Sequence, residues 1–155
     1  MKDQLIREIL KARQRVYSLA PATPLQELDL QLDFRCFIKR EDLSPINAYK
    51  WRGAYNRMCQ LSSDELAKGV ITASAGNHAQ GVALSCQILK IKGKIFMPSP
   101  TPNQKVEQVK MFGEDYIDVV LIGDTFDDAY HAAMEACERL NKTLIHPFND
   151  EKVIE

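Results

Sequence analysis

The C-terminal two-thirds of the chain alternates short apolar segments with longer segments of helical periodicity, and this alternation restricts the fold more than any other feature. The expected strands are residues 70–73, 94–97, 116–122 and 143–145, and the expected helices are residues 77–89, 101–113 and 125–140. Buried strands that alternate with helices of this length are typical of βαβ units. We therefore predict an α/β fold with a mainly parallel sheet and helices on both faces.

Capping residues mark the starts of three helices. Ser62 has an acidic residue three positions later, which is the spacing of a capping box, and Thr125 with Asp128 is expected to cap the last helix. Thr101 is predicted as an N-cap, with Pro102 at the first helical position. The last helix is expected to face the sheet with a stripe of mostly small residues: Ala129, Ala132, Ala133, Ala136 and Leu140.

The N-terminal region is less regular. Leu5, Ile9, Ala12 and Val16 line one face of a helix predicted over residues 3–18. The first twenty residues carry five basic side chains, which could indicate a transit peptide, but two acidic residues and the apolar face favour a structural helix. A cytoplasmic protein is expected. Further along, residues 34–39 are predicted as a strand, residues 40–47 as a polar loop and residues 50–60 as a helix.

Composition excludes several classes of protein. The 155 residues have a formal net charge of −1, so they lack the basic excess that nucleic-acid binding by bulk charge would need. No apolar run approaches the roughly 18 residues of a membrane span. The four cysteines are widely spaced and lie in or beside apolar runs, so we expect buried, reduced thiols rather than disulfides or metal ligands.

A turn rich in small residues, 72–81, connects an expected strand to the helix that follows it. Small residues let a ligand approach the backbone, and the helix start offers unpaired N–H groups to an anion. Ser74 and Asn77 add polar groups outside the carboxyl end of the strand, where ligands of open α/β sheets bind. The turn is thus a candidate site for a carboxylate or phosphate. Asn77 could equally serve only as a helix N-cap.

The three histidines form no recognisable metal-ligand cluster in the sequence. We expect structural or solvent roles for His131 and His146. His78 is a conceivable proton carrier, because imidazole titrates near neutral pH, but its position beside the turn suits packing equally well.

Lys50 lies between Tyr49 and Trp51 at the start of an expected helix. Lysine is normally a solvated surface residue, and partial desolvation would free its amine as a nucleophile or base. A surface role is nevertheless the ordinary expectation for a single lysine, and spacing alone does not identify a cofactor-binding one.

Together, the small-residue turn and the segment around Lys50 resemble threonine dehydratases, which are pyridoxal-phosphate (PLP) enzymes of the tryptophan-synthase β-type fold (fold type II). The resemblance is carried by Lys39-Arg40-Glu41-Asp42, residues 47–56 (NAYKWRGAYN) and residues 74–81 (SAGNHAQG). It extends from about Thr23 to Glu155, and it favours the biosynthetic type. Smaller matches are Met97-Pro98, Thr101-Pro102, Lys105-Val106, Phe112-Gly113, Pro147-Phe148 and Lys152-Val153-Ile154.

The resemblance implies a role for each matching residue. Lys50 is similar to the lysine that binds pyridoxal 5'-phosphate covalently, and Asn77 is similar to the residue that hydrogen-bonds the phenolic oxygen of the cofactor. The loop that receives the substrate carboxylate is matched by Ser74, Ala75, Gly76, Asn77 and His78. No metal is implied.

By the same resemblance, the reaction converts L-threonine to 2-oxobutanoate and ammonia, the first step of isoleucine biosynthesis. The substrate amine would displace Lys50, and the freed amine would remove the Cα proton while the pyridine ring delocalises the negative charge. The β-hydroxyl group then leaves. The full-length enzyme is expected to be a homo-oligomer that acts on a small amino acid, without a nucleic-acid or membrane partner.

Two features depart from the family pattern. Ala48-Tyr49-Lys50-Trp51 stands where the family usually has Ser-Phe-Lys and an aliphatic residue, which puts the packing around Lys50 in doubt. The glycine-rich phosphate loop and the partner of the pyridine nitrogen do not occur in this sequence. We therefore expect an N-terminal fragment, inactive by itself. Residues 1–45 would belong to the larger domain, residues 46–145 to a small α/β domain, and residues 146–155 to the return into the larger domain.

Two alternatives stay open. A serine dehydratase or serine racemase is not distinguished, because the single methyl group between the substrates contributes only ~1–3 kcal/mol in a pocket. In a different class, the chain would be a non-catalytic α/β module with at most weak anion binding. Its exposed apolar face would then favour self-association.

Overall fold

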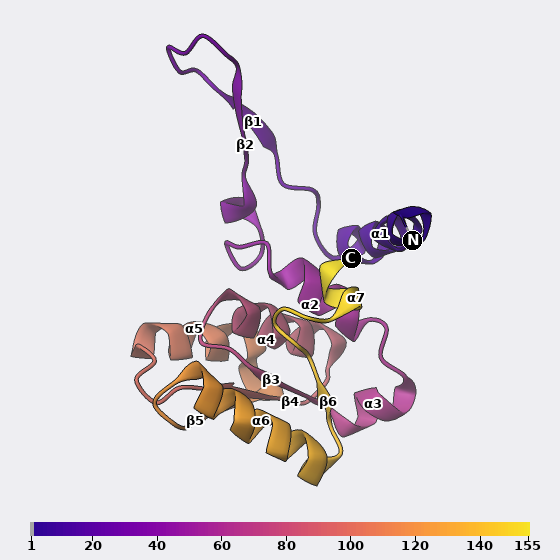
Figure 1. The fold of residues 1–155 in the computed structure, drawn as a ribbon, viewed down its shortest axis with the longest axis vertical. Coiled ribbons are helices and arrows are strands. Elements are labelled where there is room, and N and C mark those ends of the chain that lie inside the picture. The colour runs from indigo at the N-terminus through magenta and orange to yellow at the C-terminus, as the bar shows by residue number, and fades with distance from the viewer. Residues whose placement is uncertain (1) are drawn as a thin grey trace.

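The computed structural model of the protein describes residues 2–155 (Figure 1). The helices are α1 (Lys2–Leu19), α2 (Trp51–Met58), α3 (Ser63–Lys68), α4 (Asn77–Leu89), α5 (Asn103–Gly113), α6 (Phe126–Leu140) and α7 (Glu151–Ile154). The strands are β1 (Leu25–Leu28), β2 (Cys36–Lys39), β3 (Val70–Ala73), β4 (Gly93–Met97), β5 (Ile117–Leu121) and β6 (Thr143–Leu144). Short 3-10 turns lie at Glu41–Leu43 and Glu114–Tyr116.

A parallel sheet with the strand order β5-β4-β3-β6 forms the centre of the fold. Neighbouring side chains of a strand point to opposite faces. Ile95 of β4 accordingly packs with α4 and α5, whereas the next residue, Phe96, packs with α6. Figure 1 shows α6 on one side of the sheet and α4 and α5 on the other. The predicted α/β class, with helices on both faces of a parallel sheet, is confirmed.

Helix α6 uses small residues to lie close to the sheet. Ala129, Ala133 and Ala136 are buried against β3 and β4, and Ala132 is partly buried beside them. The stripe of alanines is therefore confirmed. Leu140 was wrongly placed on this inner face: it is 40% exposed, because it is the last residue of the helix and lies past the packed alanines.

The predicted caps agree with the structure at two helices and fail at the third. Ser62 and Thr125 each accept a hydrogen bond from the backbone N–H three residues later, and both capping boxes are complete. The prediction of Thr101 as the N-cap of α5 is wrong. Pro102 has an extended ψ of 135° and is itself the N-cap. The Thr101 hydroxyl donates instead to the Pro98 carbonyl at 2.6 Å, which closes the turn before the helix.

Strand β1 was not predicted from the sequence. It pairs with β2 in an antiparallel hairpin, with Leu25 opposite Lys39 and Leu28 opposite Cys36. The hairpin extends away from the parallel sheet (Figure 1), so β1 has only one neighbouring strand. Its residues are mostly exposed, and the pattern of a half-buried strand is therefore missing from the sequence.

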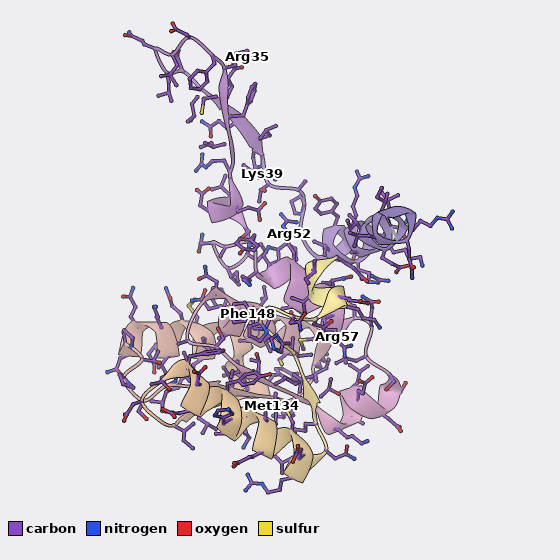
Figure 2. The ribbon with its side chains drawn as sticks, in the orientation of Figure 1. Arg35, Lys39, Arg52, Arg57, Met134 and Phe148 are labelled. Atoms are coloured by element: carbon purple, nitrogen blue, oxygen red, sulfur yellow. The ribbon has the colours of Figure 1, made fainter. Side chains whose placement is uncertain are left out.

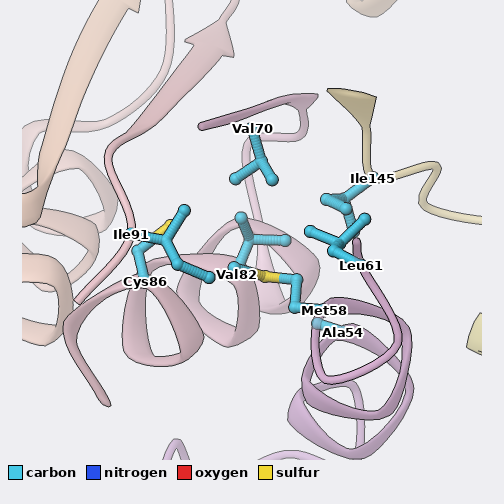
Figure 3. Close-up of a cluster of buried hydrophobic side chains, with 8 residues drawn as sticks. All are labelled: Ala54, Met58, Leu61, Val70, Val82, Cys86, Ile91 and Ile145. Atoms are coloured by element: carbon cyan, nitrogen blue, oxygen red, sulfur yellow. The ribbon is translucent and has the colours of Figure 1, made fainter. Parts of the chain in front are cut away.

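A second helical layer places the start of α2 against α4. Figure 3 shows the apolar cluster between these helices and the edge of the sheet. Its buried members are Ala54, Met58, Leu61, Val70, Val82, Cys86, Ile91 and Ile145. Burial of this cluster holds the middle and the C-terminal end of α2 beside α4, which matters because Lys50 immediately precedes α2.

The four cysteines are free thiols, as predicted. Burial is complete only for Cys86, and desolvation raises the pKa of its thiol to about 12. Cys36, Cys59 and Cys137 are half-buried rather than buried, which corrects the expectation for those three. Among the helices of residues 2–155, none combines the length and the apolarity needed to cross a membrane.

Candidate active site

Lys50 has a half-buried side chain whose amine is held by its surroundings. Its Nζ donates a hydrogen bond to the Pro147 carbonyl oxygen at 3.0 Å. The same nitrogen lies 5.2 Å from the ring centroid of Phe148 and 5.8 Å from that of Tyr49, within the range of cation–π attraction. The amine is thus bound to protein groups instead of extending freely into water. Figure 2 shows Phe148 between the start of α2 and the sheet layer.

The residues around Lys50 explain why the amine is fixed there. Trp51 is fully buried, and Ala48 is buried and bonded through both its N–H and its carbonyl to the Ser44 hydroxyl, at 2.9 Å each. A Cβ atom at Gly81 of α4 would lie 2.8 Å from the Cα of Trp51, so glycine is required for the close crossing of the two helices. Of the three residues that depart from the family pattern, Ala48 and Trp51 therefore belong to the core, whereas Tyr49 is exposed.

A second motif joins the hairpin to α2. Glu41 receives two hydrogen bonds from the Arg52 guanidinium, both at 3.1 Å, and a third from the Thr23 hydroxyl. Lys39 donates to the carbonyl of Thr23. Figure 2 shows Arg52 and Lys39 near the base of the hairpin. The Lys39–Asp42 segment thus anchors the hairpin to the first turn of α2.

The small-residue turn leads into the start of α4. Ser74, Ala75 and Gly76 are half-buried, and Asn77 is exposed. Gly76 is the N-cap of the helix and Asn77 is its first residue, so the interpretation of Asn77 as a mere N-cap is wrong. No atom lies within 4 Å of the position that a Cβ at Gly76 would take. Packing therefore does not require this glycine, and the space in front of it is open to a ligand.

His78 points into the protein interior. Its imidazole is 3% exposed, and Nε2 lies 3.1 Å from the Ile145 carbonyl oxygen. A carbonyl only accepts hydrogen bonds, so this contact assigns the proton to Nε2. Burial lowers the pKa of His78 to about 4; the positive charge of Lys50 adds to the effect, and the hydrogen bond to Ile145 opposes it. His78 is neutral at pH 7, and packing rather than proton transfer accounts for its side chain.

We call residues Ile145–Phe148 the connecting segment, because they join β6 to the turn before α7. Within it, His146 accepts hydrogen bonds at Nδ1 from the backbone N–H groups of Phe148 and Asn149, at 3.0 and 2.9 Å. Its role is therefore structural, as predicted. His131 is exposed on α6. Sequence reasoning missed the connecting segment as a neighbour of Lys50; the one available signal was the Pro-Phe match to the family.

A cavity of about 430 Å³ borders Lys50. It is formed by α1, α2, α7 and the connecting segment, with lining residues that include Val16, Tyr17, Arg52, Phe148 and Ile154. None of residues 74–78 lines this cavity. Lys50 and the turn are instead linked through the protein interior, where His78 contacts Ile145, two residues before the carbonyl that binds Lys50.

The residues present fit part of a pyridoxal-phosphate site. A half-buried amine, an exposed amide at Asn77 and an open helix N-terminus are suited to an aldehyde, a ring oxygen and an anion. The seven glycines are dispersed and form no phosphate-cradling cluster. Within the described part of the chain, no three His, Cys, Asp or Glu side chains converge as metal ligands would.

Comparisons with known proteins show which family the chain resembles. Residues 16–155 match the family model described as pyridoxal-phosphate dependent enzyme. The biosynthetic L-threonine dehydratase of Bacillus subtilis is 54% identical over 152 residues, which are 96% of this chain and 36% of that protein. That of Mycobacterium bovis is 42% identical over 150 residues, 95% of this chain and 35% of that protein.

Solved structures show the same relationship. The processed form of threonine deaminase isoform 2 from Solanum lycopersicum has a TM-score of 0.88 at 44% identity and covers 99% of this chain, with 45% of its own length matched. Maize serine racemase has a TM-score of 0.89 at 30% identity, with coverages of 96% and 45%. The chain spans 36% of the length of the Bacillus subtilis relative. Because the match to the family model covers nearly all of its residues, the chain belongs to the family of pyridoxal-phosphate dependent enzymes.

Proposed function

We propose that this chain is the N-terminal part of a threonine dehydratase (threonine ammonia-lyase), which converts L-threonine to 2-oxobutanoate and ammonia in isoleucine biosynthesis. The Lys50 amine carries the proposal, since it is half-buried and hydrogen-bonded to the Pro147 carbonyl at the start of α2. The name of the Bacillus subtilis relative, at 54% identity, supports threonine as the substrate.

Each predicted site residue has a place in this proposal. Lys50 would bind the cofactor covalently, and the exposed Asn77 amide would hydrogen-bond the phenolic oxygen. The backbone N–H groups of residues 74–78 would receive the substrate carboxylate, because a helix N-terminus carries unpaired donors and partial positive charge. Open space at Gly76 supports this role. His78 would contribute through its backbone, since its imidazole is buried.

When bound, pyridoxal phosphate supplies an electron sink for the pair released at the substrate Cα. Lys50 is the base in the proposal: its Nζ takes the Cα proton when it is free of the cofactor. Pro147 and Phe148 lie against the amine, so they limit the access of water to it. The helix N-terminus would orient the substrate by holding its carboxylate, which fixes the distance from Cα to the base.

The proposal extends to the whole enzyme. Residues 1–45 would belong to a larger domain, residues 46–145 to a small domain, and residues 146–155 to the chain's return to the larger one. The enzyme would be a cytoplasmic homo-oligomer. Serine is the competing substrate, favoured by the TM-score of 0.89 to maize serine racemase.

Reductive labelling tests the proposed cofactor site directly. The 155-residue chain is incubated with pyridoxal phosphate and reduced with borohydride, and the modified peptides are mapped. We expect the label to concentrate on Lys50 and to disappear from that peptide in Lys50→Arg, whereas Lys105→Arg, at an exposed position on α5, leaves the Lys50 label unchanged. Labelling spread evenly over surface lysines would favour the non-catalytic module. Assays of a longer chain with L-threonine and L-serine would then decide the substrate.

A further inference from the structure

We infer that His78 is a positioning residue for the Lys50 amine and acts through the connecting segment, Ile145–Phe148. The inference deepens the proposed function, on which the catalytic meaning of Lys50 rests. His78 does not touch Lys50 through any hydrogen bond. The link runs instead through two backbone carbonyls, those of Ile145 and Pro147.

The first step of the link holds Ile145 in place. Strand β6 ends at Leu144, yet the Ile145 N–H still donates to the Ile71 carbonyl at 2.8 Å. The Ile145 carbonyl accepts hydrogen bonds from two side chains, the Thr72 hydroxyl at 2.8 Å and His78 Nε2 at 3.1 Å. All of these groups are buried, so each bond is formed away from competing water.

The second step carries this position to Lys50. Pro147, two residues after Ile145, is fully buried, and its carbonyl accepts the Lys50 amine at 3.0 Å. The path between the two carbonyls is short and restricted. Proline fixes its own φ, and His146 closes the following turn by accepting two backbone hydrogen bonds. A shift of the Ile145 carbonyl therefore moves the acceptor of Lys50.

His78 also belongs to the other half of the proposed site. It is the second residue of α4 and directly follows Asn77. One buried side chain thus connects the start of α4, where the substrate carboxylate would bind, to the segment that holds the amine. Its neutral imidazole is suited to this role, because it donates from Nε2 without placing a charge in the interior.

Competitive acetylation measures the position of the amine without any cofactor. The folded chain is treated with trace acetic anhydride, and acetylation of Lys50 is compared with that of the exposed Lys105 by peptide mass spectrometry. His78→Asn shortens the side chain, so its amide no longer reaches Ile145, whereas the amide of His78→Gln takes the place of Nε2. We expect the Lys50:Lys105 ratio to rise about fivefold in His78→Asn, the factor that corresponds to one lost net hydrogen bond.

The ratio should stay at the wild-type value in His78→Gln and in the matched surface control His131→Gln. A folded His78→Asn protein with the wild-type ratio would overturn the inference, and so would an equal rise in His78→Gln. If circular dichroism shows His78→Asn to be unfolded, Thr72→Val and Thr72→Ser decide. Thr72→Val removes the other donor to the Ile145 carbonyl, and Thr72→Ser keeps it. A rise in the Lys50:Lys105 ratio only in Thr72→Val supports the link, whereas no rise refutes it. Failure of pyridoxal phosphate to label wild-type Lys50 would instead count against the proposed function.

Discussion

His78 is a residue whose ionisation the fold controls. Its pKa is about 4 in the folded protein, mainly because burial disfavours the charged imidazole. In the unfolded chain a histidine titrates near 6.5. Between these values the unfolded state binds more protons, so the free energy of unfolding falls as the pH drops from about 6.5 to about 4.

We expect protonation of His78 to lower the free energy of unfolding by about 3 kcal/mol as the pH falls over that range. Urea unfolding of the wild type and of His78→Gln, measured at pH 7 and at pH 4.5, isolates the effect, since glutamine does not titrate. The wild type should lose more stability than the variant on acidification. His131→Gln, at an exposed position, should follow the wild type. Equal losses in wild type and His78→Gln would contradict the assigned pKa.

At the scale of elements, the crossing of α2 and α4 depends on one glycine. A Cβ at Gly81 would lie 2.8 Å from backbone Cα of Trp51, whereas a Cβ at Gly76 would meet no atom within 4 Å. We expect Gly81→Ala to destabilise the protein by about 1–3 kcal/mol, because the helices must separate. Gly76→Ala should change stability by less than about 0.5 kcal/mol.

Urea unfolding of both glycine variants provides the comparison. Gly76→Ala should nevertheless reduce labelling of Lys50 by pyridoxal phosphate, since its methyl group would occupy the open space at the start of α4. Labelling undiminished in Gly76→Ala would argue against cofactor binding at this turn. If Gly81→Ala were as stable as the wild type, the close contact of the two helices would be refuted.

The start of α3 provides a second test at this scale. The Ser62 hydroxyl accepts the Glu65 N–H, and the Glu65 carboxylate accepts the Ser62 N–H at 2.8 Å. We expect Ser62→Ala to cost about 1 kcal/mol, the usual effect of losing an N-cap. Ser63→Ala, at the next and equally exposed position, should be nearly neutral. A thermal unfolding midpoint lowered only in Ser62→Ala would confirm the capping box, and equal midpoints would contradict it.

At the scale of the whole molecule, the chain carries one part of the proposed catalytic site. It contains the candidate lysine and the open helix N-terminus, but its glycines form no cluster that could hold a phosphate group. We therefore expect the 155-residue chain to show little or no dehydratase turnover. Formation of 2-oxobutanoate from L-threonine is the direct measurement. A rate near the ~10 per second typical of enzymes would contradict this expectation.

Local patterns determined most of the fold. The alternation of apolar and helical segments predicted the α/β class and the parallel sheet, and the spacing at Ser62 and Thr125 predicted two capping boxes. The alternation and the capping-box spacing are both short-range properties of the chain. Predictions failed where a residue's local preference competed with its neighbours, as at Thr101, whose hydroxyl closes a turn instead of capping α5.

The surroundings of Lys50 were decided only by the tertiary structure. The motif around Lys50 made this residue the candidate for cofactor binding, but its acceptor, the Pro147 carbonyl, lies 97 positions away in the sequence. The contact between His78 and Ile145 likewise spans 67 positions. Periodicity reports on neighbours within one or two turns of a helix. Which backbone carbonyl meets which side chain depends on how β6 returns beside β3, and that arrangement is set by packing of the complete sheet and its helices.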